Sequence, residues 1–225
     1  MRRLEPVVAI AIALAIFAAP AQAARADACT GIWAAQASPP TGRGMHPRPV
    51  IAPDRRARLE ADPGIDQLRF VGPSGRGELL QVYGAEGDAL IDPNQGLTEV
   101  MWAPDARHFV VNASDGGLVG SWNATVFAVR EGRAHRLPPL REVQLAANRL
   151  ARCEEPESAN LGVAAWLKGG AEMLVVGQVP PHSSCRNMGE LHGWRVATAS
   201  GRILESLPHA AMRRRWGDAL GCNAR

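Results

Sequence analysis

The 225-residue sequence lacks the short motifs that commonly mark redox, hydrolytic or metal sites. It contains no Cys-x-x-Cys pair, which removes the usual support for a zinc cluster or for thioredoxin-type chemistry. It has no Gly-x-Ser-x-Gly motif, so the nucleophile elbow of the α/β-hydrolases is not indicated. A net charge of only +3 gives no reason to expect a nucleic-acid partner. No apolar run reaches the ~20 residues of a membrane span.

The N-terminus has the features of a secretory signal peptide. Arg2 and Arg3 precede an apolar run over 7–19, and the small residues of Ala21-Gln22-Ala23 suit a signal peptidase. We therefore expect residues 1–23 to be a signal peptide, 24–47 an N-terminal tail, and the protein to be periplasmic or secreted, with no membrane span after cleavage. The remaining chain is long enough for one domain with a core.

One phrase is written twice, as Ile-Ala-Pro-Asp-Arg-Arg at 51–56 and as Trp-Ala-Pro-Asp-Ala-Arg at 102–107. Pro followed by Asp favours a turn between strands, because Pro fixes φ and Asp bonds the backbone two residues on. Each copy is followed by a Gly-Arg pair, at 75–76 and at 132–133, and a third unit has Trp166, Gly169-Gly170 and Gly201-Arg202. The pattern predicts three units of four strands, at about 48–84, 97–138 and 161–207.

These turns resemble the Trp-x-Pro-Asp-Gly turn of the β-propeller repeats of bacterial periplasmic proteins, except that Arg55 and Ala106 replace the Gly. The segment Val-Pro-Pro-His-Ser-Ser-Cys-Arg-Asn-Met-Gly at 179–189 also resembles a family of secreted bacterial proteins of unknown function. With the period of ~40 to 50 residues, the likeness implies an all-β fold, a propeller-like arc of three four-stranded antiparallel blades. Three blades are too few for a closed ring, so we expect an open arc or a homodimer that completes a ring.

Two short accessory helices are predicted beside the blades. Leu140, Val143, Ala147 and Leu150 share one face of a helix near 139–152. Met212, Trp216 and Leu220 share a face near 209–220, within a C-terminal helix and tail at 208–225. We expect both helices to cover exposed sheet edges.

The longest insertions, 114–125 and 179–193, belong to the same end of the meanders, where binding residues usually lie. The second insertion holds weak catalytic or metal candidates, namely His182, Ser183, Glu190 and His192. They lack the spacing of a recognised site, so we favour a disulfide-pinned loop whose polar groups bond to backbone. No catalytic residue, metal site or cofactor is predicted.

Several other residues invite a functional interpretation that a structural one outweighs. Trp102 and Trp166 occupy equivalent strand positions and are expected in the core between blades. Arg213, Arg214 and Arg215 are expected to form the solvated face of the C-terminal helix. Asp88, Asp92 and Asn94 could bind calcium, but they lack a calcium-loop motif. Glycosylation-like triplets start at Asn112 and Asn123.

Four cysteines in an exported chain predict two disulfides. Cys153 lies in the link into the third unit, and Cys185 lies in that unit's second hairpin. Both segments should lie at the same end of the meander, so we expect these two cysteines to form a disulfide. Cys29 and Cys222 would then join the two tails.

The leading hypothesis for function is a non-catalytic binding or scaffolding module with an unidentified protein or envelope partner. The alternative is a hydrolase or metal-dependent enzyme that uses the 179–193 loop. Both rest on the loop-bearing end of the arc, and fold analogy alone does not separate them.

Overall fold

A computed structural model describes residues 31–38, 48–62, 67–84, 87–89, 98–114, 120–155 and 157–225. The expected signal peptide, Cys29, most of the 24–47 tail, Asp92, Asn94 and the side chain of Asp88 lie outside the described residues. Within these ranges, none of the helices combines the length and apolar character that crossing a bilayer requires.

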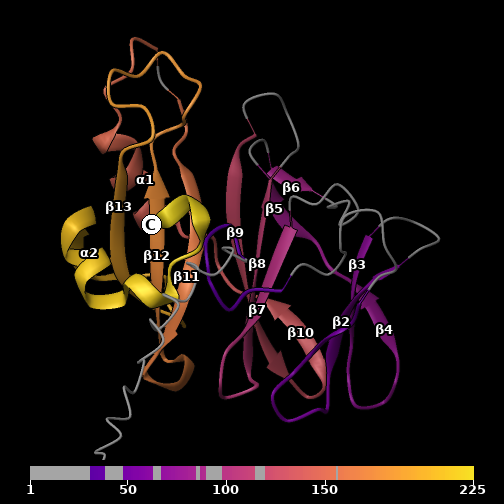
Figure 1. Ribbon diagram of the computed structural model, residues 1–225. Coiled ribbons are helices and arrows are strands. Elements are labelled where there is room, and N and C mark those ends of the chain that lie inside the picture. Colours follow the sequence, from indigo (N-terminus) through magenta and orange to yellow (C-terminus); the bar gives the residue numbers. More distant parts are fainter. Residues whose placement is uncertain are drawn as a thin grey trace, which may run out of the picture.

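The predicted three four-stranded antiparallel meanders are confirmed, and the sheets do not close into a ring (Figure 1). The first sheet consists of β1 (Val50–Ile51), β2 (Arg58–Asp62), β3 (Gln67–Val71) and β4 (Gly77–Leu79). The second consists of β7 (Thr98–Trp102), β8 (His108–Ser114), β9 (Trp122–Arg130) and β10 (Arg133–Arg136). The third consists of β11 (Asn160–Leu167), β12 (Glu172–Gln178), β13 (Leu191–Ala197) and β14 (Ile203–Pro208). A small hairpin, β5 (Val82–Gly84) with β6 (Gly87–Ala89), follows the first sheet.

The repeated phrase forms the first turn of two sheets, as predicted. Asp54 Oδ1 accepts a hydrogen bond from the backbone N–H of Arg56 at 2.9 Å, and Asp105 Oδ1 accepts one from Arg107 at 2.8 Å. At the position where the propeller pattern has Gly, Arg55 and Ala106 adopt the left-handed conformation, with φ of 60° and 55°. The backbone therefore keeps the shape that Gly would favour even though the sequence departs from the pattern.

The three sheets stack face to face, with β7–β10 in the middle. Three phenylalanines fill the first interface: Phe109 stacks on Phe70 at 5.9 Å and on Phe127 at 4.8 Å between ring centroids. The second interface is an aliphatic cluster drawn from β8, β9, β11 and β12. The core therefore has one cluster on each side of the middle sheet and a third cluster on the other face of the third sheet, where Leu174 and Val176 pack with Met212 of the C-terminal helix.

Trp102 and Trp166 pack between blades, as predicted. The Trp102 indole N–H donates to the carbonyl of Val50 in the first sheet at 3.1 Å, and that of Trp166 donates to Met101 in the second sheet at 3.2 Å. Each indole thus bonds to the first strand of the preceding blade. The same hydrogen bond therefore occurs at both interfaces, where it joins the first strands of neighbouring sheets.

Both predicted helices are present, but their placement over sheet edges was wrong. Helix α1 (Arg141–Leu150) packs Ala147 near Gly177 of the central strand β12, and α2 (His209–Trp216) packs Met212 against Gly193 of β13. The helices therefore cover faces of the third sheet. Gly193 leaves room for this packing, because a Cβ at this position would lie 2.5 Å from the Met212 sulfur and the methionine side chain would have to move. Helix α2 is shorter than predicted, and the chain continues in the 3-10 turns η3 (Gly217–Ala219) and η4 (Cys222–Ala224).

The two equivalent aspartates offer a matched test of the repeated turn. Asp105 also binds the N–H of His108 at 3.2 Å and its ring Nδ1 at 2.9 Å, whereas Asp54 bonds only to Arg56 among the described residues. We expect Asp105→Ala to lower the free energy of unfolding by about 1–2 kcal/mol and Asp54→Ala by about 0.5 kcal/mol. Urea unfolding measures both values, and equal losses would contradict the assignment.

Candidate functional site

The meander places two kinds of connection at opposite ends of the arc (Figure 1). The turn end holds the first and third turns of all three sheets. The loop end holds the second connections and the links between sheets, including the loop 179–190 and the segment 151–159. The insertion 115–119 and the links 85–86 and 90–97 lie outside the described residues.

The loop 179–190 is attached to the segment 151–159 by a disulfide and by backbone hydrogen bonds. Cys153 and Cys185 are joined, which confirms the predicted pairing. On either side of the disulfide, the N–H of Arg186 donates to the Arg152 carbonyl at 3.0 Å, and the N–H of Arg152 donates to Asn187 Oδ1 at 2.9 Å. Cys222 is also disulfide-bonded, while its predicted partner Cys29 lies outside the described residues.

Side chains complete the attachment. Both the N–H and the hydroxyl of Ser184 donate to Glu157 Oε1, at 2.8 and 2.9 Å. The Asn187 amide donates to the Leu150 carbonyl at 2.9 Å and to Glu190 Oε2 at 2.6 Å. The loop is thus attached to the neighbouring segment and to the end of α1 at several points.

The four weak candidates of this loop do not form one site. The Ser183 hydroxyl donates to the Pro180 carbonyl at 2.7 Å, Glu190 accepts from Asn187, and His192 Nε2 lies 2.8 Å from the Ser206 hydroxyl. His182 is exposed. Burial lowers the pKa of His192, although the nearby Glu190 carboxylate opposes the shift. Among the described residues, Ser183 contacts neither histidine, although a Ser-based mechanism needs an imidazole base beside the nucleophile, and the hydroxyl that His192 contacts belongs to Ser206.

Metal-ligand atoms gather in one place among the described residues, at Cys153, Glu157 and Cys185. The two sulfurs there are bonded to each other, so neither offers a thiolate to a metal ion. His182 and His192 belong to no such group in the described part of the chain. The oxidised loop thus has a structural role, and Glu157 is used in holding Ser184.

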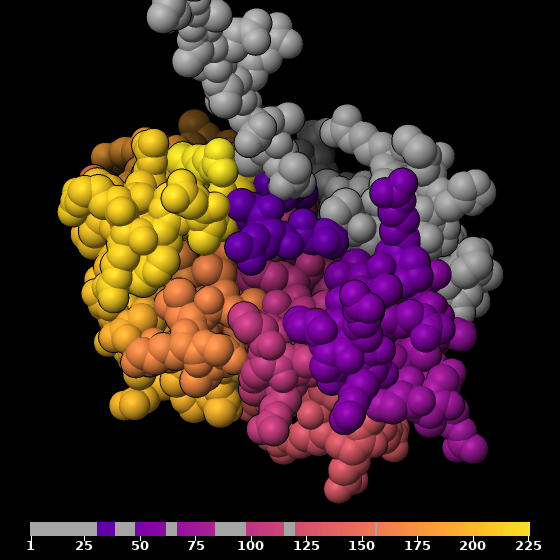
Figure 2. Space-filling view, turned by 60° about the horizontal axis from the view of Figure 1, so that its bottom comes forward, coloured from indigo at the N-terminus to yellow at the C-terminus, as the bar shows by residue number. Residues whose placement is uncertain are grey.

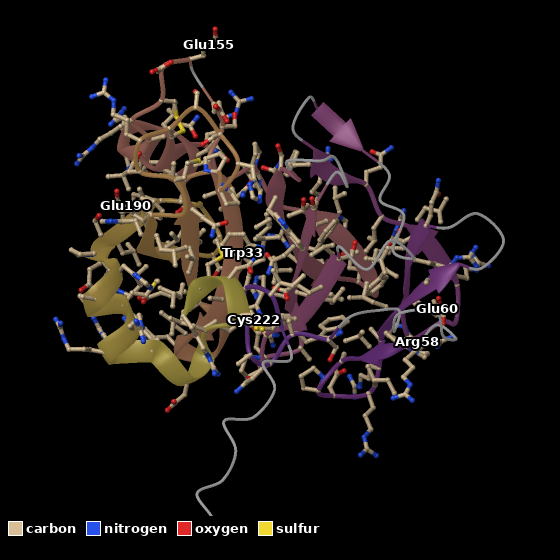
Figure 3. The ribbon with its side chains drawn as sticks, turned by 45° about the horizontal axis from the view of Figure 1, so that its top comes forward. Trp33, Arg58, Glu60, Glu155, Glu190 and Cys222 are labelled. Atoms are coloured by element: carbon tan, nitrogen blue, oxygen red, sulfur yellow. A yellow bond between two sulfur atoms is a disulfide. The ribbon has the colours of Figure 1, made fainter. Side chains whose placement is uncertain are left out.

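A buried polar network was missed by the sequence analysis. Glu99 of β7 is 3% exposed and accepts from the backbone N–H of Ile32 at 2.7 Å and of Trp33 at 3.0 Å, while the Asn112 amide donates to it at 2.8 Å. Asn112 is fully buried and bonds both the N–H and the C=O of Val163 in β11, at 2.9 and 3.0 Å. One carboxylate and one amide therefore join the N-terminal segment to the second and third sheets (Trp33 is labelled in Figure 3).

The electrostatics of this network follow from burial. Desolvation raises the pKa of Glu99 above its ordinary value, and the hydrogen bonds from Asn112 and from the backbone of residues 32–34 partly oppose the shift. The available sequence signal was a glutamate directly before the apolar stretch Val100-Met101-Trp102, whereas Asn112 was noted only as the start of a glycosylation-like triplet. Its side chain is buried in the folded protein.

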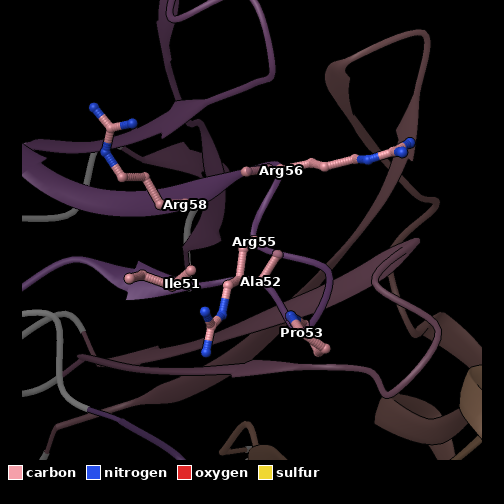
Figure 4. Close-up of a pocket in the computed structure, with 7 residues that line it drawn as sticks. Ile51, Ala52, Pro53, Arg55, Arg56 and Arg58 are labelled. Carbon is pink, nitrogen blue, oxygen red and sulfur yellow. The ribbon is translucent and has the colours of Figure 1, made fainter.

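Two open hollows lie at the turn end, which the sequence analysis treated as structural. One, of about 700 Å³, is lined by Ile51, Pro53, Arg55, Arg56 and Arg58 with two alanines (Figure 4). The other, of about 680 Å³, lies between the third turns of the first two sheets and includes Arg76 and Arg133. Neither lining contains a cysteine or a histidine. Arginine supplies every charged group of the first hollow, whereas the second has two arginines and the two glutamates Glu78 and Glu131.

No protein-family model matches the chain, and no curated protein matches it in sequence. The likeness to propeller repeats therefore stays a prediction based on the turn motifs.

Proposed function

We propose that this chain is a non-catalytic binding or scaffolding module, exported to the periplasm or beyond, that engages a protein or other envelope component through its loop end. The observation that carries the proposal is the attachment of loop 179–190. A disulfide, a backbone hydrogen bond and two side-chain anchors hold it over a rigid stack of sheets. Disulfides persist mainly in oxidising compartments, which supports export.

The pinned loop presents the side chains that a partner would contact. Met188 is 54% exposed, a large apolar side chain held at a fixed position, and His182 and Arg186 are exposed around it. Methionine and arginine are enriched in interface cores, and an apolar side chain surrounded by polar ones is the usual pattern of a binding surface. Ser183 and Glu190, two of the four weak catalytic candidates, help to hold this loop through their hydrogen bonds with Pro180 and Asn187.

The test is site-specific crosslinking in the native host. A photo-reactive phenylalanine analogue at Met188 should capture a specific partner, because Met188 lies at the centre of the proposed surface. The same analogue at Ile51, which is 59% exposed but lies near the turn end, is the matched control and should not capture it. Equal capture from both positions would contradict the proposal, as would labelling of Ser183 by a serine-directed phosphonate probe.

A further inference from the structure

Every turn at the turn end carries a basic side chain next to or within it. The six turns connect β1 to β2, β3 to β4, β7 to β8, β9 to β10, β11 to β12 and β13 to β14. Their basic residues are, in the same order, Arg56, Arg76, Arg107, Arg133, Lys168 and Arg202. Because the topology brings these turns to one end, charges spread evenly along the sequence are concentrated on one surface.

Four of the six turns place their arginine by the same device. The side-chain oxygen of an aspartate or serine accepts a hydrogen bond from the N–H of the arginine two residues later. The four pairs are Asp54 with Arg56 at 2.9 Å, Ser74 with Arg76 at 3.4 Å, Asp105 with Arg107 at 2.8 Å, and Ser200 with Arg202 at 3.4 Å. The acceptor oxygens are therefore directed to the backbone of the turn, and the arginine side chains extend outward.

These four arginines are exposed, and their guanidinium groups have no hydrogen bond or ion pair with any other described residue. Two of the remaining cations are paired, Arg133 with Glu78 at 3.3 Å and Lys168 with Glu172 at 2.7 Å. The turns themselves hold six cations, with Arg55 added to Arg56, Arg76, Arg107, Lys168 and Arg202, against the three carboxylates of Asp54, Asp105 and Glu131. The excess of three positive charges at this end equals the net charge of +3 of the whole chain, so the remainder of the chain is close to neutral. Such a segregation of charge is a basis for attraction to an anionic partner.

The arrangement of the turns indicates the shape of that partner. Stacked sheets lie ~10 Å apart, and the first and third turns of one sheet are separated by two strand spacings, again ~10 Å. By these spacings the cations lie in two rows of three. Figure 2 brings the turn end forward and shows segments of all three blades side by side there. A two-dimensional array matches a flat anionic surface better than it matches a single extended polymer.

Aromatic residues give a second reason to prefer a surface. Single-stranded nucleic acids are usually held by aromatic side chains on which bases stack. Here Trp102, Phe70 and Phe109 pack together inside the first interface, and Trp166 lies against His108. Beside the arginines of the first turn, Ile51 is 59% exposed and offers an apolar contact instead.

We propose that the turn end docks the protein on a bilayer surface rich in anionic phospholipid headgroups. The arginines act through their summed charge, and the loop end, at the opposite side, stays free for its own partner. The protein would then link a membrane surface to the component bound at the loop end.

The test compares three proteins in vesicle sedimentation, each without the expected signal peptide 1–23: wild type, a turn variant and a control variant. The turn variant carries Arg56→Gln, Arg76→Gln, Arg107→Gln and Arg202→Gln. The control carries Arg141→Gln, Arg149→Gln, Arg213→Gln and Arg214→Gln, four exposed helix arginines whose guanidinium groups have no partner among the described residues. The rest of the chain is the same in all three proteins, so differences in binding report only the substituted arginines.

Wild type and control should bind vesicles of equal parts phosphatidylcholine and phosphatidylglycerol, and not pure phosphatidylcholine. The turn variant should bind the anionic vesicles at least about tenfold more weakly, since each basic residue near an anionic surface adds to the attraction. Raising the salt from 0.1 M to 1 M shortens the screening length from ~10 Å to ~3 Å and should abolish wild-type binding. The Met188 crosslink should be unchanged in the turn variant.

A quadruple Arg→Lys variant at the four turn positions should bind as wild type does, because charge and not guanidinium geometry is required. This variant changes the same four positions but keeps their charge, so normal binding would show that the substitutions themselves do not disturb the fold. All variants should also keep the urea midpoint of the wild type. Equal losses in the turn and control variants would overturn the proposal. So would arginine-dependent binding to soluble dextran sulfate without binding to vesicles, which would assign the surface to a polymer.

Discussion

Replacing Glu99 by alanine should lower the free energy of unfolding by about 3–5 kcal/mol. The change removes the acceptor of the buried backbone N–H groups of Ile32 and Trp33 and of the Asn112 amide. Each donor left unsatisfied costs about 1–3 kcal/mol, and the relief of burying a carboxylate offsets part of the sum. Urea unfolding followed by tryptophan fluorescence measures the loss.

The matched control is Glu60→Ala, which removes a half-exposed glutamate paired with Arg58 at 2.8 Å (both labelled in Figure 3). A pair of this kind contributes about 1 kcal/mol or less. If both alanine variants lost the same amount, the buried carboxylate would not hold the N-terminal segment as described.

Glu99 also predicts a pH dependence. Because its pKa in the folded protein is raised above the ordinary 4.5, folding favours the protonated form. Its contribution to stability is therefore fully present below pH 4.5 and is lost as the pH rises through the folded pKa. The difference in unfolding free energy between wild type and Glu99→Gln should change across that window and be constant above it. A difference that is constant from pH 4 to pH 8 would refute the assigned direction.

Removing the Cys153–Cys185 disulfide should cost about 3–4 kcal/mol. The two cysteines are 32 positions apart, and closing a loop of that length restricts the unfolded chain by this amount on the chain-entropy model. The double variant Cys153→Ser, Cys185→Ser leaves the remaining cysteines in place, and its stability is measured by urea unfolding under non-reducing conditions.

The same variant should loosen the loop locally. Hydrogen exchange at the N–H of Arg186, which donates to the Arg152 carbonyl, should accelerate. Exchange at Val175 in the central strand β12 is the internal reference and should change only with global stability. A loss below about 1 kcal/mol with unchanged exchange at Arg186 would show that the hydrogen bonds alone hold the loop.

Much of the fold could be predicted from the sequence because its signals are local. Pro104 and Asp105 define a turn through their own chemistry, and Gly132 supplies a positive φ of 72° at a tight hairpin. Once the turns are assigned, the order of the strands in each sheet follows. The strand order in turn places Cys153 and Cys185 at the same end of the third sheet. Helix α1 was recognisable from the spacing of its apolar residues.

What could not be predicted depends on contacts between distant segments. The helices pack on faces because Gly177 and Gly193 leave room there, a relation that no local pattern contains. Glu99 and Asn112 carry no motif, and their roles exist only once Ile32 and Val163 lie beside them. The turn end was treated as purely structural because its arginines are far apart in sequence, although the topology assembles them on one surface.

The repeated indole hydrogen bond makes the two ends of the arc unequal with respect to the addition of a further blade. Trp102 and Trp166 each bond to the blade before their own, and Ile51 occupies the corresponding place in the first sheet, where it is 59% exposed. In the described part of the chain, no sheet precedes β1–β4, so an indole at position 51 would have no carbonyl to meet. A duplicated internal blade would contain its own tryptophan, whose indole could bond to the first strand of whichever blade precedes it. Extension ahead of the first blade would first require a tryptophan at position 51.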